Sequence, residues 1–142
     1  MQFTINRDTL LSSLTHAQGV IEKKNTLPIL SNVLMELKKG KLIVVATDLD
    51  IIFYDEIGEV KSLNEGATTT SATVLYDILR KISPNSEVNF NLKSENKLSL
   101  TADNSDFNLL CLPTDNFPNF SSDFKSDQLK IKKSKLLALL AN

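Results

Sequence analysis

The sequence has few of the residues that usually mark metal sites, disulfides or covalent catalysis. Its 142 residues include one cysteine, one histidine and no tryptophan. Cys111 cannot form an internal disulfide, which fits a reducing, cytoplasmic location, and its place in the apolar stretch 107–112 predicts burial. His16 has no second histidine to complete a common zinc ligand set, so we expect a solvated histidine, no metal and no cofactor.

Glycine is also scarce, which removes the common phosphate-binding and nucleophile motifs. Four glycines are present, and none stands in a G-x-x-x-x-G-K-[ST], G-x-G-x-x-G or G-x-S-x-G pattern. No apolar run reaches the roughly 20 residues of a membrane helix. The chain also opens without a basic and apolar leader. These absences argue against an enzyme, a membrane protein and a secreted protein.

Two carboxylates are the best remaining candidates for catalysis. Asp48 and Asp50 stand close together in the string Thr47-Asp48-Leu49-Asp50, as a small enzyme or a ligand-binding α+β domain could use them. They follow a predicted strand directly, however, and turn preference explains Asp48 more simply. This alternative predicts that replacing both by asparagine abolishes activity or binding without unfolding the chain.

The charge balance gives no overall electrostatic case for nucleic acid, because the net charge is −1. The basic residues nevertheless gather at predicted helix ends: Lys23 and Lys24 follow the first helix, and Arg80 and Lys81 end the second. The helix dipole explains Lys81. The lysines in 132–135 begin a third helix, where the dipole disfavours cations, so they indicate either a phosphate partner or a solvated charged face. Contacts to phosphate would be independent of base sequence.

The chain repeats its own opening near its end. The pattern apolar-x-apolar-x-basic-x-x-Leu-Leu-x-x-Leu occupies 3–14 and returns without a gap at 129–140. It is typical of a strand that runs into an amphipathic helix, and a repeat of this kind indicates modular architecture. We therefore expect one whole domain over 1–124 and the start of a second, truncated domain over 125–142.

A finer repeat divides the first domain into two halves. The strand-turn-strand pattern of 33–46 resembles that of 88–102, with one extra turn residue in the second copy. A helix with paired apolar residues precedes each, Leu10-Leu11 in one and Val74-Leu75 in the other. The order predicts an α+β fold of two β-α-β-β-β half-repeats, with two helices packed on one face of antiparallel sheets.

The predicted helices present different faces. The first should expose a small polar face, and the second should bury a stripe that includes Val74, Leu75 and Leu79. The members of the small polar face are Thr9, Ser12, Ser13 and His16. The predicted strands are 2–6, 31–38, 41–47, 50–58, 67–71, 87–93, 97–102 and 106–112, and the predicted helices are 7–22 and 72–82. A linker over 113–123 follows, and its Phe117 and Phe120 suggest that it packs against the domain.

Four short strings stand in order along the chain and carry a family resemblance. They are T-L-P-I-L-S-N at 26–32, T-D-L at 47–49, G-A-T-T at 66–69 and L-P-T-D-N-F-P-N at 112–119. Together with the opening M-Q-F-T-I, they resemble the N-terminal part of the bacterial sliding clamp, the beta subunit of DNA polymerase III. The resemblance covers essentially all of the chain.

The resemblance implies a DNA-clamp fold and a replication function. Subunits of that family have three domains of like fold, and two subunits join head to tail as a homodimeric ring around double-stranded DNA. Helices line the hole, and sheets form the rim. The polymerase alpha subunit and the clamp loader bind the ring. A processivity factor of this kind belongs to a nucleotidyltransferase complex without a catalytic site of its own.

The resemblance also implies roles for particular residues. Lys24 stands where the family has a DNA-contacting basic residue, and Thr73 stands where relatives can carry a second one. Arg80 joins them on a separate argument, because helical spacing places it with Thr73, Tyr76 and Asp77 on the polar face of the second predicted helix. The implied interface between subunits contains Val74, Asp106, Phe107 and Leu109.

Two departures from the family pattern affect the expectation. Asn116 replaces the usual acid before Phe-Pro, and the chain ends at Asn142, before the domains that hold the family's pocket for polymerase and loader peptides. We therefore expect that this chain alone neither closes the ring nor binds those peptides. A third reading is that it is a truncated regulator that caps clamp subunits through residues 107–109.

Overall fold

A computed structural model describes residues 1–21 and 27–118 of the chain. In chain order the elements are β1 (Gln2–Asn6), α1 (Arg7–Ala17), the 3-10 turn η1 (Pro28–Ser31), β2 (Asn32–Lys38), β3 (Lys41–Thr47), β4 (Ile52–Ile57), β5 (Val60–Asn64), β6 (Gly66–Ser71), α2 (Ala72–Lys81), β7 (Glu87–Ser94), β8 (Lys97–Ala102), β9 (Ser105–Leu112) and the 3-10 turn η2 (Thr114–Asn116). This order confirms the predicted α+β fold of two half-repeats.

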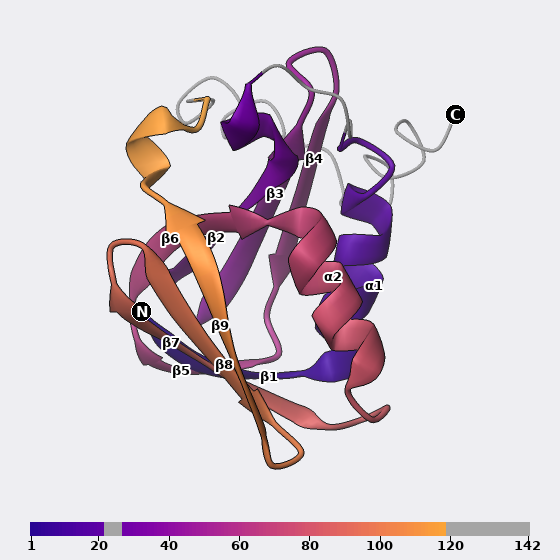
Figure 1. Ribbon diagram of the computed structural model, residues 1–142, viewed down its shortest axis with the longest axis vertical. Helices are drawn as coiled ribbons and strands as arrows, with labels where there is room; N and C mark the ends of the chain where they lie inside the picture. Colours follow the sequence, from indigo (N-terminus) through magenta and orange to yellow (C-terminus); the bar gives the residue numbers. More distant parts are fainter. Residues whose placement is uncertain (22–26, 119–142) are drawn as a thin grey trace.

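The strands of the described residues form one antiparallel sheet in the order β4-β3-β2-β6-β9-β8-β7-β1-β5 (Figure 1). Each half contributes three consecutive strands, β2-β3-β4 or β7-β8-β9, and the first strand of the other half extends them. Thus β6 pairs with β2 and β1 pairs with β7. The two halves therefore exchange strands, and neither half completes its sheet alone.

The junction between the halves is a short contact of β6 with β9, where only Thr69 and Thr70 face Leu112 and Cys111. Threonine side chains add to it: Thr69 Oγ1 donates to the carbonyl of Leu112 at 2.8 Å, and Thr70 Oγ1 donates to that of Leu110 at 2.9 Å. Both threonines are fully buried. Their hydroxyls satisfy carbonyls that a longer strand ladder would have satisfied, because buried polar groups need partners.

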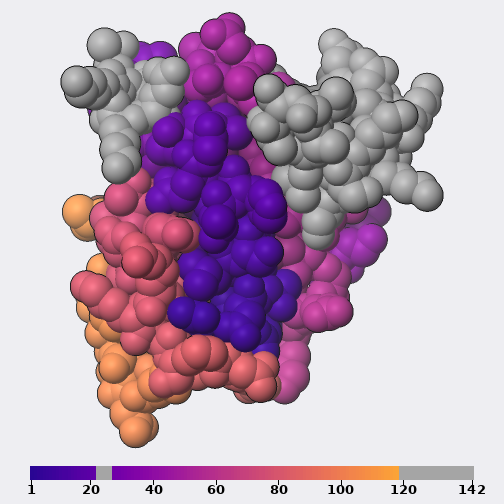
Figure 2. All heavy atoms as spheres, turned by 90° about the vertical axis from the view of Figure 1, so that its right-hand side faces the viewer, coloured from indigo at the N-terminus to yellow at the C-terminus, as the bar shows by residue number. Residues whose placement is uncertain are grey.

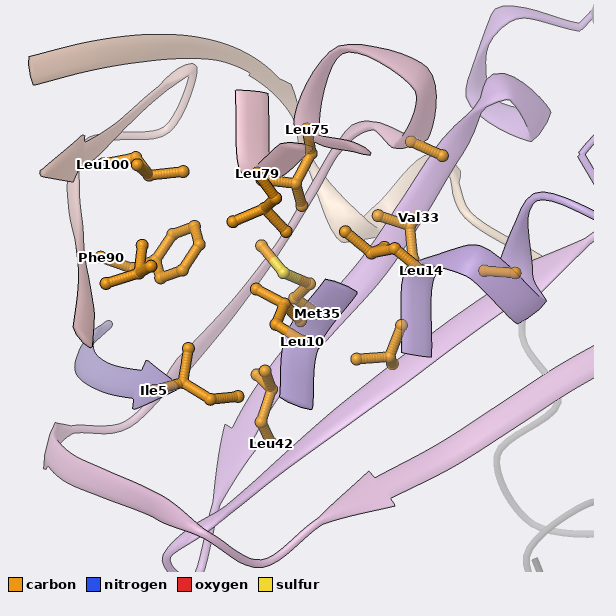
Figure 3. Close-up of a cluster of buried hydrophobic side chains, with 14 of the residues drawn as sticks. Ile5, Leu10, Leu14, Val33, Met35, Leu42, Leu75, Leu79, Phe90 and Leu100 are labelled. Carbon is orange, nitrogen blue, oxygen red and sulfur yellow. The ribbon is translucent and has the colours of Figure 1, made fainter. Parts of the chain in front are cut away.

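Both helices lie side by side on one face of the sheet, as predicted (Figure 1). Their buried residues correspond in turn, Leu10 to Leu75 and Leu14 to Leu79, and Ala17 at the end of α1 corresponds to Ile82 directly after α2. Figure 3 shows Leu10, Leu14, Leu75 and Leu79 meeting the inward side chains of the strands. Burial of these leucines, each worth about 1.5–3 kcal/mol, holds the helices on the sheet.

Helix α1 ends at Ala17, five residues earlier than expected. The chain turns at Gln18 and Gly19, and Val20 N donates to the carbonyl of Ala17 at 3.0 Å. Glycine is a poor helix former, and the turn brings Val20 into the core at 5% exposure. Packing at the end of the helix therefore decides where it stops.

Strand β5 was not predicted from the sequence. Its residues are exposed except for the half-buried Val60, and it pairs only with β1 at the end of the sheet. A strand held by backbone pairing on one side buries no alternating face, so it leaves no period-two apolar pattern. It also breaks the symmetry of the halves, because it lies beside β1.

The outer face of one half carries a second small core. Ile43 and Val45 of β3 are buried on the face opposite the helices, where they pack with Phe117. The predicted packing of Phe117 is therefore confirmed at 5% exposure, whereas Phe120 lies outside the described residues. Strand β3 is thus covered on both faces, which explains its unbroken apolar run.

Candidate nucleic-acid and subunit interfaces

The exposed surface of α1 and α2 is the candidate nucleic-acid face, and one arginine ties the two helices together. Arg7 at the start of α1 donates from Nε to the carbonyl of Leu79 at 2.9 Å, and from Nη2 to that of Arg80 at 3.5 Å. It thus caps the last turn of α2, where carbonyls lack helical partners. Sequence reasoning missed this role, although Arg7 is the basic position of the long repeat pattern.

Asp8 completes this arrangement beside Arg7. Its carboxylate lies 2.9 Å from Arg7 Nη1 and accepts from the backbone N of Asn85 at 3.1 Å. The hydrogen bond from Arg7 and then that from Asn85 lower the pKa of Asp8. Arg7 is therefore engaged in the structure of the domain, and it leaves less positive charge for a ligand.

The residues predicted to contact DNA differ in how exposed they are and in whether the structure describes them. Arg80 is exposed, with its guanidinium 5.5 Å from the centre of the Tyr76 ring, a cation–π geometry that leaves the charge accessible. Thr73 is half-buried in the first turn of α2. Lys24, with Lys23 and the lysines of 132–135, lies outside the described residues. Of the three predicted residues, Arg80 is thus the one for which the described part of the chain shows an accessible charge.

Two expectations about the helix faces are wrong. Val74 was expected on the buried stripe of the second helix, yet its exposed fraction is 48%, because the stripe runs through Ala72, Leu75 and Leu79 instead. Ser13 was expected on the polar face of the first helix, yet it is 3% exposed. It faces β4, which a helix drawn in isolation does not include.

The candidate subunit interface is one edge of β9. This strand pairs with β8 from Ser105 to Leu110, but with β6 only at Cys111 and Leu112. Over 105–110 the other edge therefore has no partner strand among the described residues. Exposed backbone of this kind is a template for pairing with another chain.

The side chains of this edge are placed unevenly. Asp106 is exposed and Phe107 is half-buried, whereas Leu109 is 2% exposed and packs in the chain's own core. Leu110 points the other way and is 85% exposed. A partner could therefore contact the exposed side chains of Val74 and Asp106 and the solvent-accessible part of the Phe107 ring.

One of the two candidate catalytic carboxylates, that of Asp48, has a structural role in a turn. Asp48 Oδ1 accepts from the backbone N of Asp50 at 2.9 Å and from that of Ile51 at 2.7 Å. Thr47 Oγ1 closes the same turn by accepting from Leu49 N and donating to the carbonyl of Ile51. This network explains Asp48 without chemistry, as turn preference predicted.

The remaining reactive residues occupy unreactive settings. His16 is exposed, and its Nδ1 lies 2.9 Å from the carbonyl of Ser12. Cys111 is buried, as predicted, and burial raises the pKa of its thiol, which lowers the share of reactive thiolate. Within residues 1–21 and 27–118 no group of three His, Cys, Asp or Glu could hold a metal ion. In the same ranges no helix has the length and apolar content needed to cross a bilayer.

Comparison with known proteins gives one consistent family. Residues 1–121 match the family described as DNA polymerase III beta subunit, N-terminal domain. The chain is 38% identical to the beta sliding clamp of Caulobacter vibrioides (strain NA1000 / CB15N) over 141 residues. This alignment covers 99% of this chain and 38% of the relative. The chain is 34% identical to the beta sliding clamp of Escherichia coli (strain K12) over 127 residues, 89% of this chain and 34% of the relative.

Solved structures agree. Caulobacter crescentus pol III beta superposes with a TM-score of 0.80 at 40% identity, over 87% of this chain and 33% of that one. The DNA polymerase III subunit beta from Pseudomonas aeruginosa superposes with a TM-score of 0.81 at 33% identity. That superposition covers 86% of this chain and 33% of the other chain. The chain thus spans little more than a third of the length of the relatives it matches. By sequence and by fold, it belongs to the DNA polymerase III beta subunit family, the bacterial sliding clamps.

Proposed function

We propose that this chain acts as the first module of a replication sliding clamp, a ring that encircles duplex DNA and tethers the replicative polymerase. The observation that carries the proposal is the match of residues 1–121 to the clamp N-terminal domain. The module would occupy 1–124, and 125–142 would begin the second one. No catalysis is assigned to the chain: it would serve a nucleotidyltransferase complex as its processivity subunit.

On this proposal the paired helices face the DNA. Arg80 supplies an accessible charge, Lys24 adds a second, and Thr73 supplies a hydroxyl but no charge. Exposed carboxylates on the same helices, Asp8 and Asp77, limit the positive potential. Binding would therefore be weak, independent of base sequence and sensitive to salt. A closed ring needs no tighter contact, because topology retains the DNA while the weak contacts allow sliding.

The free edge of β9 would join the subunits. A head-to-tail homodimer would add a strand of the partner's last module to residues 105–110, with Val74, Asp106, Phe107 and Leu109 at or behind the contact. Leu109 would act from behind, since it already packs in the core at 2% exposure. Strand addition supplies backbone hydrogen bonds along the edge. Such an interface is heterologous and closes when the rotation completes a ring.

The remaining partners follow from the ring. The polymerase alpha subunit and the clamp loader would bind through the later modules, beyond residue 142. A replication clamp works on the chromosome, so we place this one in the bacterial cytoplasm.

Arg80→Ala tests the DNA face in the full-length subunit. Loss of one phosphate contact should weaken binding to linear duplexes of any sequence and reduce the slope of log K against log salt by about 0.9. Fluorescence anisotropy over a series of salt concentrations measures both. Lys97→Ala, which removes an exposed charge from the β7–β8 hairpin, is the matched control and should change neither. An unchanged slope for Arg80→Ala, or an equal change for Lys97→Ala, would contradict the proposed face.

A further inference from the structure

Four side chains of β9 point to the outer face of the sheet, away from the helices. Side chains alternate along a strand, and the even-numbered residues of β9 are exposed: Asp106, Asn108, Leu110 and Leu112. The inward side chains differ, because Phe107 and Leu109 pack in the chain's own core. Figure 2 looks onto the helices and shows the orange segment that contains β9 at one margin, beyond α2. A partner that reaches the free edge of β9 therefore meets these outward side chains.

Leu110 ends an apolar row that crosses the outer face. It is 85% exposed, the most among the large apolar side chains of the described residues. A single exposed leucine is ordinary on a protein surface, but this one has apolar neighbours. Leu112 faces Thr69 across the contact of β9 with β6, and Thr69 in turn faces Leu34 of the second small core. The row thus runs from that core to the point where β6 stops pairing, and Leu110 lies there uncovered.

Asp106 supplies the only charge of the edge stretch 105–110. It is exposed and forms no ion pair with residues 1–21 or 27–118. A strand added beside β9 would hold a side chain of its own about 4.5–5.5 Å from each outward residue. Opposite charges at such cross-strand positions are favourable and like charges are not. A lysine or arginine is therefore the side chain that fits opposite Asp106.

We infer that the outward side chains of β9 select the partner's strand, an inference that rests on the proposed ring and its free β9 edge. All strand pairs of the described sheet are antiparallel. An antiparallel strand from the last module of a second subunit carries an aliphatic side chain opposite Leu110. Four residues later along its own direction it carries a lysine or arginine opposite Asp106. The two pairs fix the register, because a slip by one residue turns every side chain to the other face.

Leu110→Ser in the full-length subunit tests the aliphatic pair. Association should weaken about tenfold, because the leucine would no longer bury apolar surface against the partner. Analytical ultracentrifugation gives the dissociation constant. Leu63→Ser makes the same change at a leucine that is 69% exposed on β5, three strands away from β9, and should leave association unchanged. The circular dichroism spectrum of each variant in the 142-residue chain checks that the domain still folds.

Asp106→Asn tests the ion pair. It should weaken association several-fold at low salt and have less effect at about 1 M salt, where charges are screened within about 3 Å. Asp106→Lys should weaken association further, because it places two cations opposite each other. Asp50→Asn removes an exposed carboxylate from the turn between β3 and β4 and should change association at neither salt concentration.

The outcomes separate this selection from the ring itself. The selection is supported if Leu110→Ser and Asp106→Asn both weaken association beyond their controls. It is overturned if either variant associates as its control does, or if Asp106→Lys associates no more weakly than Asp106→Asn. Disruption by Phe107→Asp without any effect of the outward variants would keep the β9 edge as the interface and overturn the selection. A full-length subunit that stays monomeric would overturn both.

Discussion

Phe90→Ala is expected to lower the free energy of unfolding by about 3–5 kcal/mol, as large-to-small substitutions of buried aromatic residues do. Phe90 is fully buried, and its ring stacks on that of Phe3 with centroids 4.8 Å apart. The two residues face each other across the pairing of β1 with β7. The stack therefore joins the first strand of one half to the sheet of the other, and its loss weakens the exchange of strands between the halves.

Urea denaturation followed by circular dichroism measures this effect in the 142-residue chain. Lys93→Ala on the same strand is the control: Lys93 is exposed, so the change should stay within about 0.5 kcal/mol. A loss below about 1 kcal/mol for Phe90→Ala would mean that the core can close around the cavity. The stack would then not be what joins the halves.

Phe107→Asp is expected to weaken the association of full-length subunits by about 100-fold or more, because a carboxylate would be desolvated at an apolar contact. Phe107 is half-buried on the stretch of β9 that pairs on one side only. Analytical ultracentrifugation over a range of protein concentrations gives the dissociation constant. The circular dichroism spectrum of the same variant in the 142-residue chain checks that the domain still folds.

Leu63→Asp provides the control for the interface. It introduces the same carboxylate at a leucine that is 69% exposed on β5, which the sheet order separates from β9 by three strands. We expect it to weaken association less than tenfold, since an exposed substitution has a small effect. Equal disruption by both variants, or none by Phe107→Asp, would contradict an interface at residues 105–110. Capture of the full-length subunit by the 142-residue chain, lost in Phe107→Asp, would favour the capping regulator.

The pattern of apolar residues along the sequence predicted most of the helices and strands. In most of the strands every second side chain is buried, and the buried side chains of a helix recur at helical spacing. Ser71 caps α2 by accepting from Val74 N at 3.2 Å, as a serine before an apolar helix indicates. Strand β5 escaped prediction because its residues gain little from burial. Its pairing with β1 depends on a contact distant in sequence, which no local pattern contains.

The candidate site was less predictable from the sequence, because it depends on what packs against each helix and strand. Sequence alone favours exposure for a polar residue, yet Ser13 of α1 and Asp55 of β4 are both buried. The edge of β9 is free only because its contact with β6 stops after two residue pairs. Leu109 was expected at a partner's surface, and its burial in the chain's own core follows from the same arrangement.

Retention on DNA of different topology tests the central claim most directly. The full-length subunit would be loaded onto a nicked circular plasmid and followed by gel filtration before and after the plasmid is cut to a linear form. A ring held by topology and weak phosphate contacts should stay on the circle and leave the linear DNA within minutes. Equal loss from both forms, or equal retention on both, would show that the protein does not encircle DNA.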